Sequence, residues 1–138
     1  MPDGDSRIFH HDLCFGCGQA NLFGLQLELE PHPGGGVEGR FFVKQDNQGP
    51  PGLAHGGVLA AALDEAMALL LNAERIFAVT GRIEIDFLAP APVGAFVAVR
   101  ARMLGAEGRK VRLEADAAVG ERSVARARAT FVRRALDK

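Results

Sequence analysis

The chain has no tryptophan and no tyrosine, and only two of its 138 residues are cysteines. Two cysteines are too few for a disulfide scaffold in a chain of this size and favour a reducing compartment. An excess of charge is also lacking, because the formal net charge is −1 and the isoelectric point is near 6.4. Without a basic excess there is no electrostatic field to attract nucleic acid or an anionic membrane, so neither partner is expected.

Long hydrophobic runs are missing as well. No apolar run reaches the length of a membrane span, and residues 1–12, MPDGDSRIFHHD, are acidic and polar where a secretory signal needs a basic and then an apolar start. We therefore predict a cytoplasmic protein in which residues 1–12 form a loosely held arm. With 48% hydrophobic and 24% charged residues and no internal repeat or linker, residues 1–138 are predicted to form one domain.

A stretch from Val58 to Leu71 contains no glycine, no proline and almost no polar residue, and its alanine, leucine and methionine residues favour a helix. The segment GPPGLAHGG, residues 49–57, precedes it and supplies a helix-breaking start. Because this helix of about four turns is apolar on all sides, we expect other elements to enclose it. Asp64 and Glu65 are its only acids, and a carboxylate in such a helix must be paired, exposed at an interface or functional.

Alternation of apolar and polar residues predicts strands on both sides of this helix. Before it, leucines alternate over residues 25–30 up to Pro31 and Pro33, and a glycine turn at 34–36 leads into a second strand over 37–44. After it, alternating segments cover residues 82–87, 97–103, 111–119 and 125–131. Consecutive strands joined by short turns are expected to be antiparallel neighbours, which predicts a four-strand meander. The sum is an α+β fold, with one helix packed on one face of a curved antiparallel sheet.

Both cysteines lie in the sequence CFGCG, residues 14–18. With His10 and His11 upstream they offer the residue types of a Cys₂His₂ zinc site, but adjacent histidines are poorly placed to ligate together and zinc fingers spread their ligand pairs over a longer loop. A redox Cys-x-x-Cys motif lies between a strand and a helix, and neither is predicted here. We expect no metal and no cofactor, and a glycine-rich turn whose thiols pack as small apolar groups.

Several motifs occur in an order that resembles one enzyme family. The segments CFGCGxxNxxGLxL (residues 14–27) and QGPPGxxHGGxxxxxxDE (48–65), followed by Thr80 and FxxPxPxG (87–94), are similar to those of the hotdog-fold thioesterases. More narrowly, they resemble the branch that includes PaaI-like proteins and the human thioesterase superfamily member 4 type. The resemblance implies a hotdog fold, in which a sheet wraps a long central helix. It also implies hydrolysis of an acyl-CoA to a free acid and CoA, without a metal or cofactor.

The residues at the start of the predicted helix suit this chemistry. Thioester hydrolysis places negative charge on the carbonyl oxygen, and a backbone N–H at a helix N-terminus can stabilise that charge. Gly57 is the candidate donor because a residue without a side chain lets the substrate approach the backbone, and Gly56 in the same turn is expected to contact substrate. The alternative is that both glycines only form a tight turn. His55 is expected to orient this loop or to hydrogen-bond the carbonyl, rather than to act as the base.

Asp64 is the candidate for activating water or attacking the carbonyl directly, since either path needs an ionised carboxylate near the carbonyl carbon. Glu65 is its local rival, about 100° around the helix, and is expected to contact substrate. The resemblance implies two more roles. A side-chain amide before the His-Gly-Gly turn binds the carbonyl, which Gln48 fits with Asn47 as a rival. A Ser or Thr after the helix positions water, which Thr80 fits unless it only starts a strand.

Helix geometry separates these candidates within one chain. The nine positions from His55 to Asp64 rise about 13.5 Å and turn about 900°, so the two side chains point to opposite sides of the helix. A site that uses both must be shared between two antiparallel central helices of a symmetric homodimer. The resemblance implies the same arrangement, often doubled to a homotetramer.

Two other functions remain open from the sequence. A non-catalytic acyl-CoA sensor should carry a DNA-binding appendage or lack the acid, whereas Asp64 is present and no such appendage is expected here. A dehydratase or hydratase of the same fold would use His55 as the base against a substrate carbon, a role that the spacing to Asp64 does not require. Acyl-CoA hydrolysis is therefore the predicted activity, with acyl-CoA as the partner.

Overall fold

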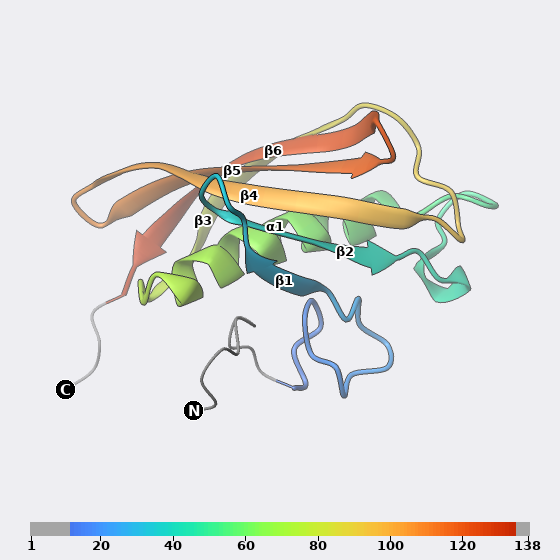
Figure 1. Ribbon diagram of the computed structural model, residues 1–138, viewed down its shortest axis with the longest axis horizontal. Helices are drawn as coiled ribbons and strands as arrows, with labels where there is room; N and C mark the ends of the chain where they lie inside the picture. Colours follow the sequence, from blue (N-terminus) through green and yellow to red (C-terminus); the bar gives the residue numbers. More distant parts are fainter. Residues whose placement is uncertain (1–11, 135–138) are drawn as a thin grey trace.

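The structure is a computed structural model that describes residues 12–134, so most of the predicted N-terminal arm lies outside the described residues. One long helix packs against a six-stranded antiparallel sheet, and Figure 1 shows the sheet curving over the length of that helix. The elements are β1 (Glu28–Pro31), β2 (Val37–Phe42), the short 3-10 helix η1 (Gln45–Asn47), α1 (Gly56–Ala73), β3 (Ala78–Phe87), β4 (Phe96–Glu107), β5 (Lys110–Val119) and β6 (Arg122–Arg133). The predicted α+β architecture is confirmed.

Helix α1 extends two residues beyond the predicted segment at each end. It begins at Gly56 because the side chain of His55 caps it, accepting a hydrogen bond from the N–H of Gly57. It ends where Arg75 takes a left-handed φ of 60° and the N–H of Ile76 reaches back to the carbonyl of Leu71 at 2.8 Å, which satisfies a terminal acceptor.

By length and composition alone, α1 is apolar enough to cross a membrane, with a mean hydropathy of 1.4 over 18 residues. The expectation that no run reaches such a length is therefore wrong. The packing gives another reason for this composition, because the buried side of α1 faces the sheet across a shared core. Its buried residues are Leu59, Ala62, Leu63, Ala66, Met67, Leu69, Leu70 and Leu71.

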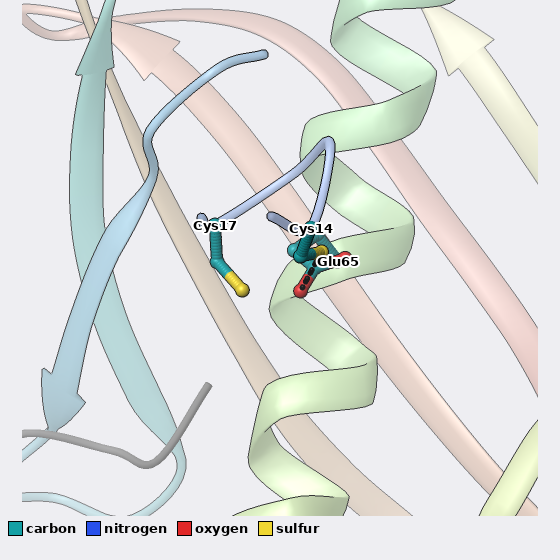
Figure 2. A group of neighbouring side chains, drawn as sticks. All are labelled: Cys14, Cys17 and Glu65. Atoms are coloured by element: carbon teal, nitrogen blue, oxygen red, sulfur yellow. Dashed lines mark hydrogen bonds between the residues drawn. The ribbon is translucent and has the colours of Figure 1, made fainter. Parts of the chain in front are cut away.

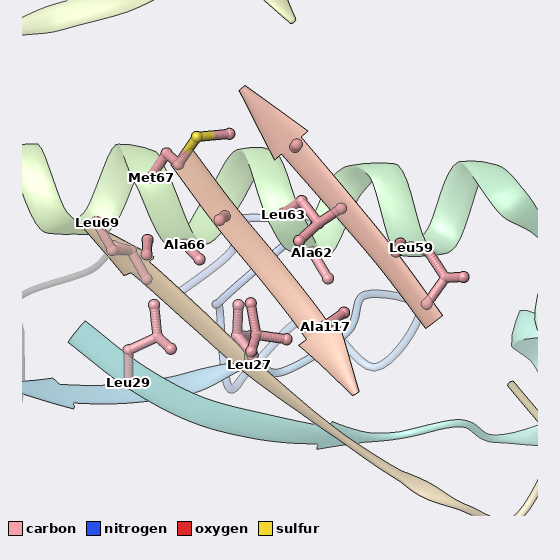
Figure 3. Close-up of a cluster of buried hydrophobic side chains, with 14 of the residues drawn as sticks. Leu27, Leu29, Leu59, Ala62, Leu63, Ala66, Met67, Leu69 and Ala117 are labelled. Carbon is pink, nitrogen blue, oxygen red and sulfur yellow. The ribbon is translucent and has the colours of Figure 1, made fainter. Parts of the chain in front are cut away.

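The core lies between α1 and the inner face of the sheet, as Figure 3 shows for part of it. The predicted alternation is confirmed on β4, β5 and β6, whose inner side chains are buried and whose outer ones face solvent. The buried inner residues of β4, β5 and β6 include Val97, Val99, Ala101, Val111, Leu113, Ala115, Ala117, Ala125, Ala127, Ala129 and Phe131. Burial of this apolar area supplies the main stabilisation of the fold.

The strand order is β1-β2-β4-β5-β6-β3, and it corrects one prediction. Strands β4, β5 and β6 form a meander, but β3 pairs with β6 at the sheet edge and does not neighbour β4. β3 need not pair with β4 because the connection between them, residues 88–95, is longer than a tight turn. It runs beside the loop that precedes α1, where Ala54 donates to the carbonyl of Ala91 at 2.8 Å and Leu53 bridges Pro92.

The first strand is also shorter than predicted. Leu25 and Leu27 are buried as expected, but they precede β1, because Gln26 between them has a positive φ of 53° that no strand allows. Their backbone N–H groups bond instead to the carbonyls of Phe15 and Gly16, at 2.8 and 2.9 Å. The alternating leucines therefore tie the cysteine-containing turn to the core. Strand β2 likewise ends at Phe42 rather than at residue 44.

Candidate functional site

The loop before α1 is held in one shape by backbone hydrogen bonds. Gln48 and Ala54 form an isolated antiparallel bridge, and the N–H of Gly49 donates to the carbonyl of Leu53 at 2.9 Å. The N–H of His55 donates to the carbonyl of Asn47 at 2.8 Å, which fixes the first residue before the helix. The loop therefore presents the start of α1 from a rigid base.

His55 and Gly57 are in direct contact. The Nδ1 atom of His55 accepts the backbone N–H of Gly57 at 2.8 Å, and the His55 side chain is otherwise exposed. A backbone N–H can only donate, so Nδ1 must be unprotonated and the neutral ring carries its proton on Nε2. The N–H expected to stabilise a carbonyl oxygen is therefore already used within the protein, while Nε2 of the exposed His55 has no hydrogen bond among the described residues.

Gln48 and Asn47, the two amides proposed for the carbonyl, differ in exposure. Asn47 is 3% exposed, and its Oδ1 accepts the N–H of Lys44 at 3.0 Å, so its side chain stabilises the loop. Gln48 is exposed, and its Oε1 accepts the N–H of Gly52 at 2.6 Å. That contact orients the amide and leaves its Nε2 without a hydrogen bond among the described residues. Of the two, Gln48 is the one that can reach a ligand.

Asp64 and Thr80 are brought together from α1 and β3. The Thr80 hydroxyl donates to Asp64 Oδ1 at 2.6 Å, and no ion pair of Asp64 occurs within residues 12–134. Both residues are accessible, Asp64 partly and Thr80 openly. A hydrogen bond of this kind orients one carboxylate oxygen and leaves the other free to interact with water or substrate.

A β-bulge at Gly81 makes this contact possible. Thr80 is opposite Phe131 while Arg82 is opposite Thr130, so Gly81 is an extra residue in β3. Directly opposite residues lie on the same face of a sheet, and Phe131 is buried beneath α1. In a regular strand Thr80 and Arg82, two positions apart, would share the outer face, because side chains alternate along a strand. The bulge thus turns Thr80 towards the helix.

Glu65 points to a different neighbourhood from Asp64. Its carboxylate Oε2 lies 3.5 Å from the Sγ of Cys14, and the glycine turn at Gly16 passes directly over its side chain. Burial, followed by hydrogen bonding and charge repulsion from Glu65, raises the pKa of the Cys17 thiol well above its usual range. A protonated, buried thiol is a poor nucleophile, which argues against Cys17 as the group that attacks a thioester.

Phe87 is a residue at this site that the sequence analysis did not assign a role. Its ring lies over the start of α1, because a Cβ placed on Gly56 would be 3.6 Å from ring atom Cε1. Phe87 is 55% exposed, so it offers an apolar surface at the start of α1. The signal available in the sequence was its position at the start of the FxxPxPxG segment, where an exposed aromatic follows a run of inward isoleucines.

The structure does not join the two halves of the predicted site within one chain. His55 with Gly57 and Gln48 lies at the N-terminal end of α1, whereas Asp64 with Thr80 lies at its middle, and no hydrogen bond connects the two groups in the described residues. A cavity of about 710 Å³ opens beside β1, β2 and β4, and its walls contain none of these residues. It is therefore not a pocket for the reaction centre.

Known proteins share this fold and match much of the chain. A family model described as the thioesterase superfamily matches residues 51–125, more than half of the chain. The structure resembles that of a thioesterase superfamily protein, with a TM-score of 0.82 and 23% identity; the match covers 88% of this chain but only 60% of that one.

Two further solved structures are similar. A hypothetical thioesterase of Streptococcus pneumoniae with coenzyme A has a TM-score of 0.74 and 20% identity, over 81% of this chain and 88% of that one. The E. coli PaaI protein from the phenylacetic acid degradation operon has a TM-score of 0.76 and 22% identity, over 85% and 87%. At these identities the likeness establishes the shared fold alone. No curated protein matches the sequence.

Proposed function

This chain belongs to the thioesterase superfamily, and from that membership we propose that it hydrolyses an acyl-CoA thioester to a free carboxylic acid and CoA. The observation that carries the proposal is the pair formed by Asp64 and Thr80 at 2.6 Å. An accessible carboxylate in the middle of an otherwise apolar helix, oriented by a hydroxyl, has the geometry of a group that acts on water or on a carbonyl carbon. A CoA-bound relative of the same fold supports CoA esters as the substrate class.

The carbonyl oxygen is polarised at the start of α1. The positive end of the helix, the Nε2–H of His55 and the Nε2 amide of Gln48 are the donors that remain available there. Gly57 contributes its N–H only when substrate displaces the Nδ1 atom of His55, so we assign it a share of the oxyanion site together with His55. Gly56 allows close approach of the thioester, and Phe87 forms an apolar wall for the acyl group.

Asp64 supplies the other half of the reaction. As a general base its free carboxylate oxygen takes a proton from water, the water oxygen bonds to the carbonyl carbon, and collapse of the oxyanion breaks the C–S bond. The CoA thiolate leaves and takes up a proton. As a nucleophile Asp64 would instead bond to the acyl carbon, releasing CoA and forming an anhydride that water then hydrolyses. Thr80 holds the carboxylate, or the water beside it, in either path.

A complete site requires a second copy of the chain. Strand β3 is at the sheet edge, so one side of its ten residues has no partner strand within residues 12–134, and Val79 and Phe87 on it are exposed. A long, partly apolar free edge invites pairing with another strand. We propose a homodimer in which two β3 strands pair and His55 of one protomer faces Asp64 of the other. Association of two such dimers into a homotetramer is the further step.

The experiment is a thiol-release assay with purified protein and acetyl, medium-chain, long-chain and aryl CoA esters. Turnover of at least one ester, abolished by Asp64→Asn, is the expected result. Binding of acyl-CoA without release of CoA would overturn the assignment as a hydrolase and indicate an acyl-CoA binding module. Hydration of an enoyl ester, or dehydration of a hydroxyacyl ester, would instead indicate a hydratase or dehydratase. We place this reaction in the cytoplasm, without nucleic acid or membrane as partner.

A further inference from the structure

Three side chains that bind metals converge beside α1. The Sγ atoms of Cys14 and Cys17 and a carboxylate oxygen of Glu65 all lie within 4.8 Å of one another, and Figure 2 shows them gathered between the turn and the helix. The two thiols come from the CFGCG turn and the carboxylate from α1, 48 positions further along the chain than Cys17. The sequence alone offered only the two thiols and the upstream His10 and His11 as ligands. Those two histidines lie outside the described residues.

One separation in this cluster is that of a tetrahedral zinc centre, and the others lie within 4.8 Å. With a Zn–S bond of about 2.3 Å and a Zn–O bond of about 2.0 Å, the sulfur and oxygen ligands of a tetrahedron are about 3.5 Å apart. The Sγ of Cys14 is 3.5 Å from Oε2 of Glu65. For two sulfurs the corresponding separation is about 3.8 Å. The two Sγ atoms lie within 4.8 Å of each other, a limit that includes this value.

The turn is built to keep the three groups together. A Cβ on Gly16 would lie 2.5 Å from the Cγ of Glu65, and a Cβ on Gly18 would lie 2.5 Å from the N of Cys14. Glycine at both positions lets the turn close over the carboxylate. Backbone hydrogen bonds hold that closed shape, from Gly18 to the carbonyl of Cys14 at 2.8 Å and from Leu27 to the carbonyl of Gly16 at 2.9 Å.

The part of the chain that the structure describes gives this cluster no positively charged ion-pair partner. Within residues 12–134, no Lys, Arg or His forms an ion pair with Glu65, although Glu65 is only partly exposed and Cys17 is 1% exposed. A carboxylate packed against two thiols and only partly open to solvent is costly unless a cation or a hydrogen-bond network compensates it. A divalent metal compensates all three groups at once, because thiolates and carboxylate are its ligands.

We propose that Cys14, Cys17 and Glu65 form a structural zinc site that anchors the N-terminal turn to α1. Two thiolates select a soft or borderline ion, and zinc is bound by thiolate and carboxylate in tetrahedral geometry. Binding replaces the two thiol protons, which pass to solvent, and leaves one position for a fourth ligand. The site is separate from the proposed reaction centre, because Glu65 lies about 100° around the helix from Asp64.

The test measures metal without using substrate, so its outcome does not depend on the proposed hydrolase. The full-length protein is purified without chelators and its zinc content is measured by mass spectrometry, with about one zinc per chain expected. After removal of zinc, titration with Co²⁺ should give a thiolate-to-cobalt charge-transfer band, and Cys14→Ser or Cys17→Ser should each remove about half of its intensity. Chelation should lower the Tm of the wild type.

The variant Glu65→Gln distinguishes a metal site with three protein ligands from one formed by the two cysteines alone. Loss of a ligand should weaken Co²⁺ binding by on the order of 10- to 100-fold. Glu74→Gln is the matched control, an exposed acid at the C-terminal end of the same helix, and it should bind Co²⁺ as the wild type does. Wild-type affinity in Glu65→Gln would overturn the assignment, as would less than about 0.1 zinc per chain together with no cobalt band, or a disulfide between the two cysteines in the isolated protein.

Discussion

Asp64 and Glu65 are adjacent acids on one helix with different surroundings. Asp64 faces β3, where the hydroxyl of Thr80 holds it and solvent reaches it. Glu65 faces the N-terminal turn, where Cys14 contacts it and Gly16 covers it. Neighbours on an α-helix are about 100° apart, so one step along the chain moves a carboxylate from an open edge of the sheet to a packed corner. The chemistry of an acid is set by what it faces rather than by its residue type.

The difference also assigns separate tasks to the two acids. A group that exchanges protons with water must be reachable and must keep one oxygen unbound, as Asp64 does. A group that ligates an ion must be held at a fixed distance from other ligands, as Glu65 is. The comparison therefore predicts that exchanging the acids for amides will give two different losses, one in turnover and one in metal binding and stability.

The largest expected effect is on turnover in Asp64→Asn. We expect hydrolysis to fall at least about 10²-fold while acyl-CoA binding and the dimer remain, because the amide cannot accept a proton or attack. The checks are steady-state thiol release, binding calorimetry and light scattering. Glu65→Gln is the matched control, with turnover expected to persist. Loss of turnover in Glu65→Gln, together with near-normal turnover in Asp64→Asn, would assign the catalytic role to Glu65 instead of Asp64.

The second prediction tests whether Asp64 of one protomer acts together with His55 at the start of α1 of the other protomer. His55→Ala and Asp64→Asn are each expected to be inactive, but their mixed dimer contains one site with both groups intact. If half of the dimers are mixed and sites act independently, activity should return to about a quarter of wild type under two-fold symmetry. Co-expression, with the mixed species verified by mass, provides the measurement. No recovery in verified mixed dimers would contradict the shared site.

A smaller effect is expected from the partner of Asp64. Thr80→Val keeps the side-chain volume but removes the hydroxyl, and a hydrogen bond to a charged group contributes about 1.5–3 kcal/mol. We expect kcat to fall about tenfold with little change in KM, because the hydroxyl orients the carboxylate or its water rather than the acyl chain. Thr130→Val on β6 is the control and should retain kcat. Equal losses in both variants would indicate a general disturbance of the sheet.

The smallest effect concerns the packing over Glu65. Gly16→Ala places a methyl group 2.5 Å from the Glu65 Cγ, which should destabilise the fold by about 1–3 kcal/mol and leave kcat unchanged. Because the three nearest atoms all belong to Glu65, the same change in a Glu65→Ala background should cost less. Urea unfolding of the four proteins measures the coupling. Additive losses would place the strain elsewhere in the turn.

Much of the fold is readable from the sequence, because it rests on local periodicity. The apolar run that forms α1 and the alternation in β4, β5 and β6 each reflect burial of one side of an element. The position of β3 is not readable in this way. Alternation indicates which face of β3 is inward but not which strand it joins, and the connection over 88–95 is long enough for either neighbour.

The candidate site also has features that the sequence predicts and features that it does not. The resemblance supplied His55, Asp64 and Thr80, and the structure adds that Thr80 contacts Asp64. The hydrogen bond from Gly57 to His55 was not foreseeable, since it depends on the rotamer of a capping side chain. Nor was the approach of Glu65 to Cys14, which joins two segments far apart in sequence and which no local pattern indicates.

The extra residue Gly81 affects how this site can change by inheritance. Gly81 is the extra residue, so deletion of its codon would place Thr80 directly before Arg82, and alternation would still leave Thr80 opposite Phe131 on the inner face. Loss of the hydrogen bond between Thr80 and Asp64 in such a deletion variant would show that the bulge also sets the backbone conformation at Thr80. Related chains can carry or lack this residue without moving Thr80 to the other face of the sheet, because a bulge absorbs one codon of length while the acid keeps its partner.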